Sequence, residues 1–317
     1  TIGISKSNIE FFNNSIVNVN KIAWKLKKIE IFTEKLGREK LINFENNNAE
    51  LFSIIRNQRL LDLLSISLSK NKYFKKISLF KNLNFLNNYN LVINTDFSNP
   101  ITKKYFSKKI LKKYNSFAYT TTILHEKIHN NVAVQIFTKM GPLAFLPISP
   151  KETSVVYSLN NHKNINYMNV SKLIEQYNYK YKIHKIEKIN SFELKFLSLR
   201  SYYHNHILAF GDLLHRIHPL AGQGFNMTIR DIKILLEIII NKYSLGLPID
   251  TSVNYEFENK IRHKNLIFSN GIDFVYEFFN FDRKIENNFL RRSIQLIGKN
   301  APINKLFTKV ADRGILF

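Results

Sequence analysis

The sequence predicts an α/β fold that is interrupted by a β-rich segment and followed by a C-terminal helical region. Short apolar runs at 91–96 and 207–210 end in Asp or Gly, which is typical of buried strands that lead into loops. Residues 117–160 alternate in polarity and carry the turn signal Met-Gly-Pro at 140–142, so they predict an antiparallel sheet. Helical patterns follow Gly246 to the end. Strands and helices on both sides of a sheet-rich middle indicate an interrupted α/β domain.

The remaining elements follow from hydrophobic periodicity. Residues 5–26 predict helices, because their apolar side chains fall loosely on one stripe. Lys28–Phe32 predicts a strand. Ile54–Leu68 predicts a helix with leucines at helical spacing, and a long helix is expected from Asn226 to Lys242.

Composition excludes several classes of protein. The 317 residues are 44% apolar and 22% charged, which is ordinary for a globular chain and argues against global disorder. There is no cysteine, so disulfide scaffolds, cysteine nucleophiles and thiolate metal sites are excluded. No segment reaches the roughly 18 apolar residues of a spanning helix. The first residues lack the pattern of a secretory signal peptide.

The formal charge of +23 allows two interpretations. A basic chain with 13% aromatic residues suits nucleic-acid binding. However, the basic residues are scattered, and the enrichment in Lys, Asn and Ile throughout the chain is what AT-rich coding produces. The charge therefore favours weak attraction to an anionic membrane surface over nucleic-acid binding.

The loop at 211–226 carries the most chemical information. Gly211 would let a ligand approach the backbone, and the Asp212 carboxylate suits hydrogen bonds from sugar hydroxyls. Gly222 and Gly224 permit a tight turn beside a flat ring. The following helix presents unpaired N–H groups and a positive dipole end, which favour an anion. A flavin matches these features, because its reduced form carries negative charge along one ring edge.

The full segment reads Gly-Asp-Leu-Leu-His-Arg-Ile-His-Pro-Leu-Ala-Gly-Gln-Gly-Phe-Asn. It resembles the second FAD-binding motif of the para-hydroxybenzoate hydroxylase-like flavin hydroxylases, in the form found in ubiquinone-biosynthesis hydroxylases such as the 2-polyprenyl-6-methoxyphenol hydroxylases. The resemblance implies that the Asp meets the ribityl–pyrophosphate region and that the Pro–Gly–Gln–Gly turn lies against the isoalloxazine ring. The residues assigned to FAD in this segment are Gly211, Asp212, Pro219, Gly222, Gln223, Gly224, Phe225 and Asn226.

Two further segments resemble cofactor motifs of the same family. Residues 91–104 resemble its middle motif, with Asp96 present but Phe97 in the place of Gly and Pro100 in the place of Ser. That motif is associated with both FAD and NAD(P)H. Arg56–Leu60 resembles the start of a helix that sets an Asn-Arg pair near the flavin, with Gln58 in the Arg place. The resemblance therefore adds Asp96 and Gln58 to the FAD-binding residues.

The resemblance also implies a domain organisation. Residues 119–147 are similar to the family's substrate-domain sheet, and the tail from Asn304 is similar to its helical end. The fold class implied is an incomplete Rossmann-like FAD-binding domain interrupted by a β-rich substrate domain. The expected domains are 1–26, 51–112 and 201–245 for FAD; 27–50 and 113–200 for substrate; and 246–317 for the C-terminal helices.

One pattern suggests a metal but is explained better by a strand. His125-Glu-Lys-Ile-His129 fits the His-Glu-x-x-His zinc motif, which needs a helix so that both imidazoles share one face. The flanking residues are β-rich, and positions four apart in a strand lie roughly 13 Å from one another. We therefore expect no metal site.

The family's Gly-x-Gly-x-x-Gly turn has no counterpart in the chain. Of the ten glycines, only Gly222 and Gly224 form a Gly-x-Gly, and Met227 stands where the third glycine would fall. We expect about 30–40 further residues upstream, the span of one βαβ unit, that carry this turn. The alternative is that the protein has lost this pyrophosphate-binding turn.

The function implied is a flavin-dependent monooxygenase that uses FAD, NAD(P)H and O₂ to hydroxylate a polyprenylated phenol in ubiquinone biosynthesis. No acid or base stands out as catalytic. Of the two roles that suit His215 and His218, proton transfer and loop packing, loop packing is the expected one. The expected location is cytoplasmic, with peripheral contact at the inner face of the cell membrane and with a quinone-biosynthesis assembly. Two alternatives stay open: a degenerate, non-enzymatic subunit of that assembly, and a basic nucleic-acid-binding protein. The phenylalanines that suit either an apolar groove or a packed helix core are Phe274, Phe278, Phe279 and Phe281.

Overall fold

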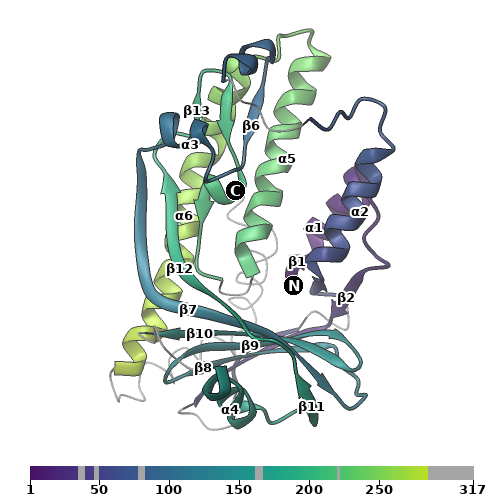
Figure 1. The fold of residues 1–317 in the computed structure, drawn as a ribbon, viewed down its shortest axis with the longest axis vertical. Coiled ribbons are helices and arrows are strands. Elements are labelled where there is room, and N and C mark those ends of the chain that lie inside the picture. The colour runs from purple at the N-terminus through teal and green to yellow at the C-terminus, as the bar shows by residue number, and fades with distance from the viewer. Residues whose placement is uncertain (35–39, 46–49, 78–82, 161–166, 220–221, 285–317) are drawn as a thin grey trace. The chain divides into compact units, whose positions relative to one another are not determined.

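The computed structural model divides into two units (Figure 1), and each contains a core of buried apolar side chains of its own. The first unit comprises Thr1–Leu61, Lys113–Leu194 and Val275–Asp312; the second comprises Asp62–Lys112, Lys195–Phe274 and Arg313–Phe317. The structure describes residues 1–317 except 35–39, 46–49, 78–82, 161–166, 220–221 and 285–317. This division does not test the domain boundaries expected from the sequence, which stay a prediction.

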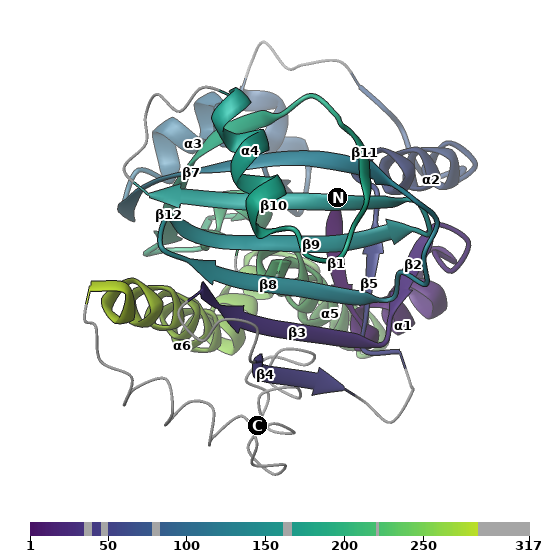
Figure 2. The same cartoon turned by 90° about the horizontal axis from the view of Figure 1, so that it is seen from below.

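The first unit is built on a large sheet whose strands run in the order β12-β7-β10-β9-β8-β3-β4, with β11 paired to β7 (Figure 2). The pairs β7–β10, β10–β9 and β9–β8 are antiparallel, as the alternating pattern predicted. The predicted strand at Lys28–Phe32 is confirmed as β3, which runs parallel to β8. The bounds are β3 Lys28–Thr33, β4 Lys40–Glu45, β7 Lys109–His125, β8 Val132–Thr138, β9 Gly141–Ser149, β10 Glu152–Asn160, β11 Ile183–Ile186 and β12 Asn190–Leu199.

One face of this sheet is covered by α4 (Tyr167–Tyr177), which crosses the strands in Figure 2. Alternation along β10 directs Val155, Tyr157 and Leu159 into a common core, where each side chain is fully buried. Val170 and Ile174 of α4 belong to the same core. The inward-facing side chains that alternate along β10 therefore pack against the apolar stripe of α4 in one layer.

Gly141 opens β9 in a backbone conformation that requires glycine. Its φ is +147°, and a Cβ placed there would lie 1.8 Å from the carbonyl oxygen of Ser158 on β10. The turn is held by Thr138, whose Oγ1 donates to the Gly141 carbonyl at 2.7 Å. The buried hydroxyl of Tyr157 lies 2.9 Å from the same Thr138 oxygen. The Met-Gly-Pro turn signal therefore marks a site of close approach between two strands.

The zinc-like pattern does not lie on a helix, as expected. His125 is the last residue of β7 and is buried, whereas His129 is exposed in the loop that follows. The His125 ring is bonded to Thr153 Oγ1 at 3.0 Å and lies against Tyr181, whose pKa is raised to about 12 by burial. Among the described residues, no group of three or more His, Asp or Glu could hold a metal ion. His125 is thus a bonded core residue.

A small sheet in the same unit corrects two helix boundaries. β1 (Ile2–Ser5), β5 (Phe52–Ile55) and β2 (Ala23–Leu26) pair in the order β1-β5-β2. The prediction of helix over 5–26 is right only for α1 (Lys6–Phe11) and the π-helical turn Phe12–Ile16. It is wrong for β2, because Leu26 packs with Ile54 and Ile148 rather than on a helical stripe. The helix expected from Ile54 begins three residues later, as α2 (Asn57–Ser69), for the same reason.

The second unit contains a three-stranded sheet, β13-β14-β6, and two long helices (Figure 1). The predicted strands at 91–96 and 207–210 are confirmed as β6 and β14, which are parallel. The long helix predicted after the loop is confirmed as α5, and α6 confirms a helix after Gly246. The bounds are β6 Val92–Asn94, α3 Pro100–Tyr105, β13 Tyr203–His204, β14 Ile207–Ala209, β15 His215–Arg216, α5 Gln223–Ser244 and α6 Thr251–Lys284, with 3₁₀ turns at Leu83–Asn88 and Gly211–Leu213.

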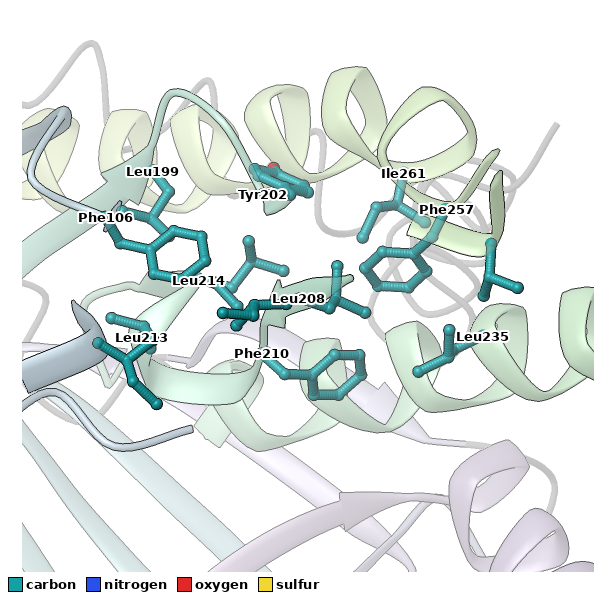
Figure 3. Close-up of a cluster of buried hydrophobic side chains, with 14 of the residues drawn as sticks. Phe106, Leu199, Tyr202, Leu208, Phe210, Leu213, Leu214, Leu235, Phe257 and Ile261 are labelled. Atoms are coloured by element: carbon teal, nitrogen blue, oxygen red, sulfur yellow. The ribbon is translucent and has the colours of Figure 1, made fainter. Parts of the chain in front are cut away.

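The core of the second unit surrounds β14 (Figure 3). Leu208 and Ala209 are fully buried, and Phe210 stacks on Phe257 of α6 with ring centroids 5.6 Å apart. Leu235 contributes from α5. The strand that leads into the Gly-containing loop is therefore fixed by both long helices.

No helix in the described part of the chain is long and apolar enough to cross a membrane. Phe274 on α6 is 69% exposed, so the packed-core interpretation is wrong for this residue. The side chains of Phe278, Phe279 and Phe281 and the tail from Asn304 lie outside the described residues.

Candidate functional site

Two of the predicted cofactor segments leave the same edge of the second unit's sheet. Ala209 of β14 is in register with Asn94 of β6, and the Phe210 N–H donates to the Asn94 carbonyl at 2.9 Å. Asp96 and Asp212 therefore follow the carboxyl ends of adjacent parallel strands. In open α/β sheets, ligands bind outside these strand ends.

Gly211 and Asp212 form the first part of the loop. Gly211 has a φ of +63°, and a Cβ there would find only Thr228 Cγ2, at 4.0 Å. Its backbone conformation, rather than crowding within the chain, explains the glycine. The Asp212 side chain is 78% exposed and lies 4.0 Å from Arg216 Nη2, which is too long for a hydrogen bond. The carboxylate is therefore accessible to a ligand.

The Asp96 carboxylate accepts hydrogen bonds within its own turn. Its Oδ1 accepts from the Ser98 hydroxyl at 2.7 Å and from the Ser98 N–H at 2.8 Å, and these bonds lower the pKa of Asp96. Pro100 occupies the first turn of α3 after the Asn99 cap, where proline is favoured, so its departure from the family's Ser has a local reason. Phe97 is exposed, with Lys109 Nζ 4.4 Å from its ring centroid.

The second part of the loop turns sharply into α5. Gly222 is the N-cap with φ +63°, its N–H donates to the Pro219 carbonyl at 3.3 Å, and Asn226 Nδ2 donates to the Gly222 carbonyl at 3.1 Å. A Cβ on Gly224 would lie 3.8 Å from Ile217, which is an ordinary contact. Packing within the chain does not require glycine at position 224, but the close approach of a bound ring would require it.

Some buried polar atoms in this loop have no hydrogen-bond partner among the described residues, which points to a bound ligand. Gln223 and His215 are both 3% exposed, and within the described part of the chain Gln223 Oε1 and His215 Nδ1 have no hydrogen-bond partner. Buried polar atoms are normally bonded, so two such atoms in one loop suggest that a bound molecule completes them. The positive end of the 22-residue α5 begins at the same place. These residues fit a flavin with donor groups and an anionic edge.

The remaining predicted site residues are placed less specifically. Phe225 is half-buried on the first turn of α5. Leu220 and Ala221 lie outside the described residues. Gln58 lies at the exposed start of α2 in the first unit, so its assignment to the cofactor stays a prediction.

Sequence reasoning missed one partner in the site. His215 Nε2 lies 2.6 Å from Asp231 Oδ2 on α5, and Asn265 Nδ2 of α6 donates to Asp231 Oδ1 at 3.2 Å. All three side chains are buried. The signal was an acidic residue between Ile229 and Ile232 on the apolar face of α5, since a buried carboxylate needs partners.

Sequence comparison finds relatives among enzymes of ubiquinone synthesis, while no protein-family model matches the chain. Ubiquinone hydroxylase UbiL of Rhodospirillum rubrum is 25% identical over 206 residues, covering 62% of this chain and 48% of that protein. The 3-demethoxyubiquinol 3-hydroxylase of Escherichia coli is 28% identical over 152 residues, or 46% of this chain and 39% of that protein. The chain spans about half the length of the curated relatives it matches.

Comparison of structures supports the same fold. The p-nitrophenol 4-monooxygenase of Pseudomonas putida superposes with a TM-score of 0.74 at 11% identity, covering 100% of this chain and 90% of that one. A probable FAD-dependent monooxygenase of Pseudomonas aeruginosa gives a TM-score of 0.67 at 10% identity, covering 93% and 88%. The predicted fold class is thereby confirmed. The chain is thus similar in sequence to ubiquinone-biosynthesis hydroxylases and has the fold of the FAD-dependent monooxygenases.

Proposed function

We propose that the chain belongs to an FAD-dependent monooxygenase that hydroxylates the ring of a polyprenylated phenol in ubiquinone biosynthesis, with NAD(P)H as reductant and O₂ as oxidant. The observation that carries this proposal is the loop between β14 and α5, where Gly211 and Gly222 have positive φ and where, among the described residues, the buried Gln223 Oε1 and His215 Nδ1 have no hydrogen-bond partner. The relatives named as ubiquinone hydroxylases support the substrate class. They do not favour a non-enzymatic subunit or a nucleic-acid binder.

The chain's own groups have distinct roles in this proposal. Asp212 accepts hydrogen bonds from sugar hydroxyls, and Asp96 offers its second carboxylate oxygen at the same sheet edge. Gly222 and Gly224 admit a flat ring beside the backbone. The N-terminus of α5 stabilises negative charge on that ring. Bound FAD would supply the redox and oxygen chemistry that no side chain can.

The proposal includes where the protein works. The prenyl tail of the substrate is membrane-soluble, and the net charge of +23 favours contact with an anionic leaflet. We therefore propose peripheral contact at the inner face of the cell membrane and a place in a quinone-biosynthesis assembly.

Replacing the exposed loop carboxylate tests cofactor binding. Asp212→Ala should weaken FAD binding about tenfold or more, because the loss of a charge-assisted hydrogen bond costs about 1.5–3 kcal/mol. Stability should barely change, since the Asp212 side chain is 78% exposed and its ion pair is long. The measurement is a fluorescence titration of the protein, produced from its complete coding sequence, with FAD.

Glu237→Gln is the matched control, since Glu237 is an exposed carboxylate on α5 outside the loop. The control should bind FAD like the unmodified protein. Equal FAD affinities for Asp212→Ala and Glu237→Gln would remove Asp212 from the site.

A further inference from the structure

The strongest unused feature of the second unit is the buried pair His215–Asp231. The two side chains are 3% and 1% exposed, and His215 Nε2 lies 2.6 Å from Asp231 Oδ2. Asn265 Nδ2 donates to Asp231 Oδ1 at 3.2 Å. Both oxygens of the carboxylate are thus engaged, and three segments of the chain hold the imidazole ring in one orientation.

The neighbouring charges leave His215 as the principal partner of Asp231. Arg262 on α6 is bound to Glu258, with Nη1 3.1 Å from Oε1. Tyr202 lies in the same region, and its pKa is raised by burial and then by the charge of Asp231. Because the phenol is harder to ionise there, Tyr202 adds no second negative charge. The imidazole therefore faces one carboxylate.

This pairing places a hydrogen on Nε2 of His215. An ionised carboxylate only accepts hydrogen bonds, so Nε2 must donate to Asp231. In the neutral ring the proton on Nε2 leaves Nδ1 as an acceptor. Nδ1 is buried and has no partner within the described part of the chain. An unpaired acceptor costs stability unless a bound molecule supplies a donor.

We propose that His215 is a cofactor-binding residue, whose Nδ1 accepts a hydrogen bond from an N–H or O–H group of a flavin dinucleotide held by the loop. Asp231 is a positioning residue that keeps the ring in the Nε2–H form. The inference rests on the proposed function and deepens it, because it replaces loop packing as the role of His215. His215 lies in the loop between Asp212 and Gln223, which are assigned to the same cofactor.

Three variants separate binding from packing. In His215→Gln the amide nitrogen can keep the bond to Asp231, but nothing replaces Nδ1. Asp231→Asn keeps the shape of the carboxylate, but its amide can donate to Nε2. The ring hydrogen then moves to Nδ1, which can no longer accept a hydrogen bond. His206→Gln is the control, because His206 Nε2 lies 3.1 Å from the Leu86 carbonyl in the same unit and the amide can keep that bond.

The readouts are FAD affinity, the visible absorption spectrum of bound flavin, and the melting temperature of the protein without FAD. We expect His215→Gln to melt close to the control yet to bind FAD about fivefold to tenfold more weakly, as for one lost hydrogen bond. Asp231→Asn should weaken FAD binding similarly and shift the spectrum. In the unmodified protein, the ¹⁵N resonance of His215 Nδ1 should move when FAD binds, which needs no variant to fold.

The outcomes distinguish this inference from the proposed function. If the unmodified protein binds FAD, but His215→Gln and Asp231→Asn bind it equally well or the Nδ1 resonance stays still, the pair is structural and the inference is wrong. If the unmodified protein binds no FAD, the proposed function fails and the inference fails with it.

Discussion

Gly141→Ala is expected to destabilise the first unit's sheet strongly. The added Cβ would lie 1.8 Å from the Ser158 carbonyl oxygen, and Gly141 has a φ of +147°. The clash is with the backbone of β10, which cannot rotate away as a side chain could. Overpacking costs about 1–3 kcal/mol, and holding a non-glycine residue in this sparsely populated backbone region costs about 1–3 kcal/mol more. Urea unfolding followed by circular dichroism, which reports on the sheets and helices of both units, would measure the loss.

Gly246→Ala is the matched control for this prediction. Gly246 also has a positive φ, +68°, but a Cβ there would meet nothing within 4 Å. Only the backbone strain of about 1–2 kcal/mol should appear. Equal destabilisation by the two substitutions would show that β9 and β10 are not in close contact at this turn.

Phe257→Ala should be the most damaging truncation in the second unit. Phe257 is fully buried and stacks on Phe210, the residue directly before Gly211 (Figure 3). Removing a buried phenyl ring costs about 3–5 kcal/mol in lost packing and cavity formation. Because Phe210 sets the backbone from which the loop leaves, FAD affinity should fall as well. Thermal unfolding and FAD titration measure the two effects.

Tyr255→Ala provides the comparison on the same helix. Tyr255 is 60% exposed, so its truncation should change stability by no more than about 0.5 kcal/mol and leave FAD affinity unchanged. A Phe257→Ala protein as stable as Tyr255→Ala would contradict the core described around β14.

Elements that depend on local interactions could be predicted from the sequence, whereas an element that depends on contacts with distant residues could not. β14, the loop and α5 were predicted because a short apolar run, glycines and helical periodicity are local signals. Residues 23–26 were misassigned as helix because β2 exists through pairing with β5, which follows much later in the chain. Such pairing leaves little trace in a short apolar segment, and tertiary contacts override local propensity.

The same distinction applies to the candidate site. Asp212, Gly222 and Gln223 follow one another closely, so a motif could identify them. The contact of His215 with Asp231 depends on how α5 packs beside the loop, and that of Asp231 with Asn265 depends on α6. The position of Asp231 on the apolar face of α5 signals that it needs a partner, but no local pattern identifies that partner. The sequence therefore indicated the binding loop but not Asp231 and Asn265, the side chains that hold His215 in position.

Isotope labelling tests the central claim most directly. The protein made from its complete coding sequence would be supplied with FAD, NAD(P)H, a polyprenylated phenol and ¹⁸O₂. In monooxygenation one atom of O₂ enters the ring as a hydroxyl and the other leaves as water, while NAD(P)H is oxidised. We expect a product that carries one ¹⁸O atom, formed only when FAD and reductant are present. FAD-bound protein that oxidises NAD(P)H without placing ¹⁸O in any such phenol, or protein that binds no FAD, would contradict the account.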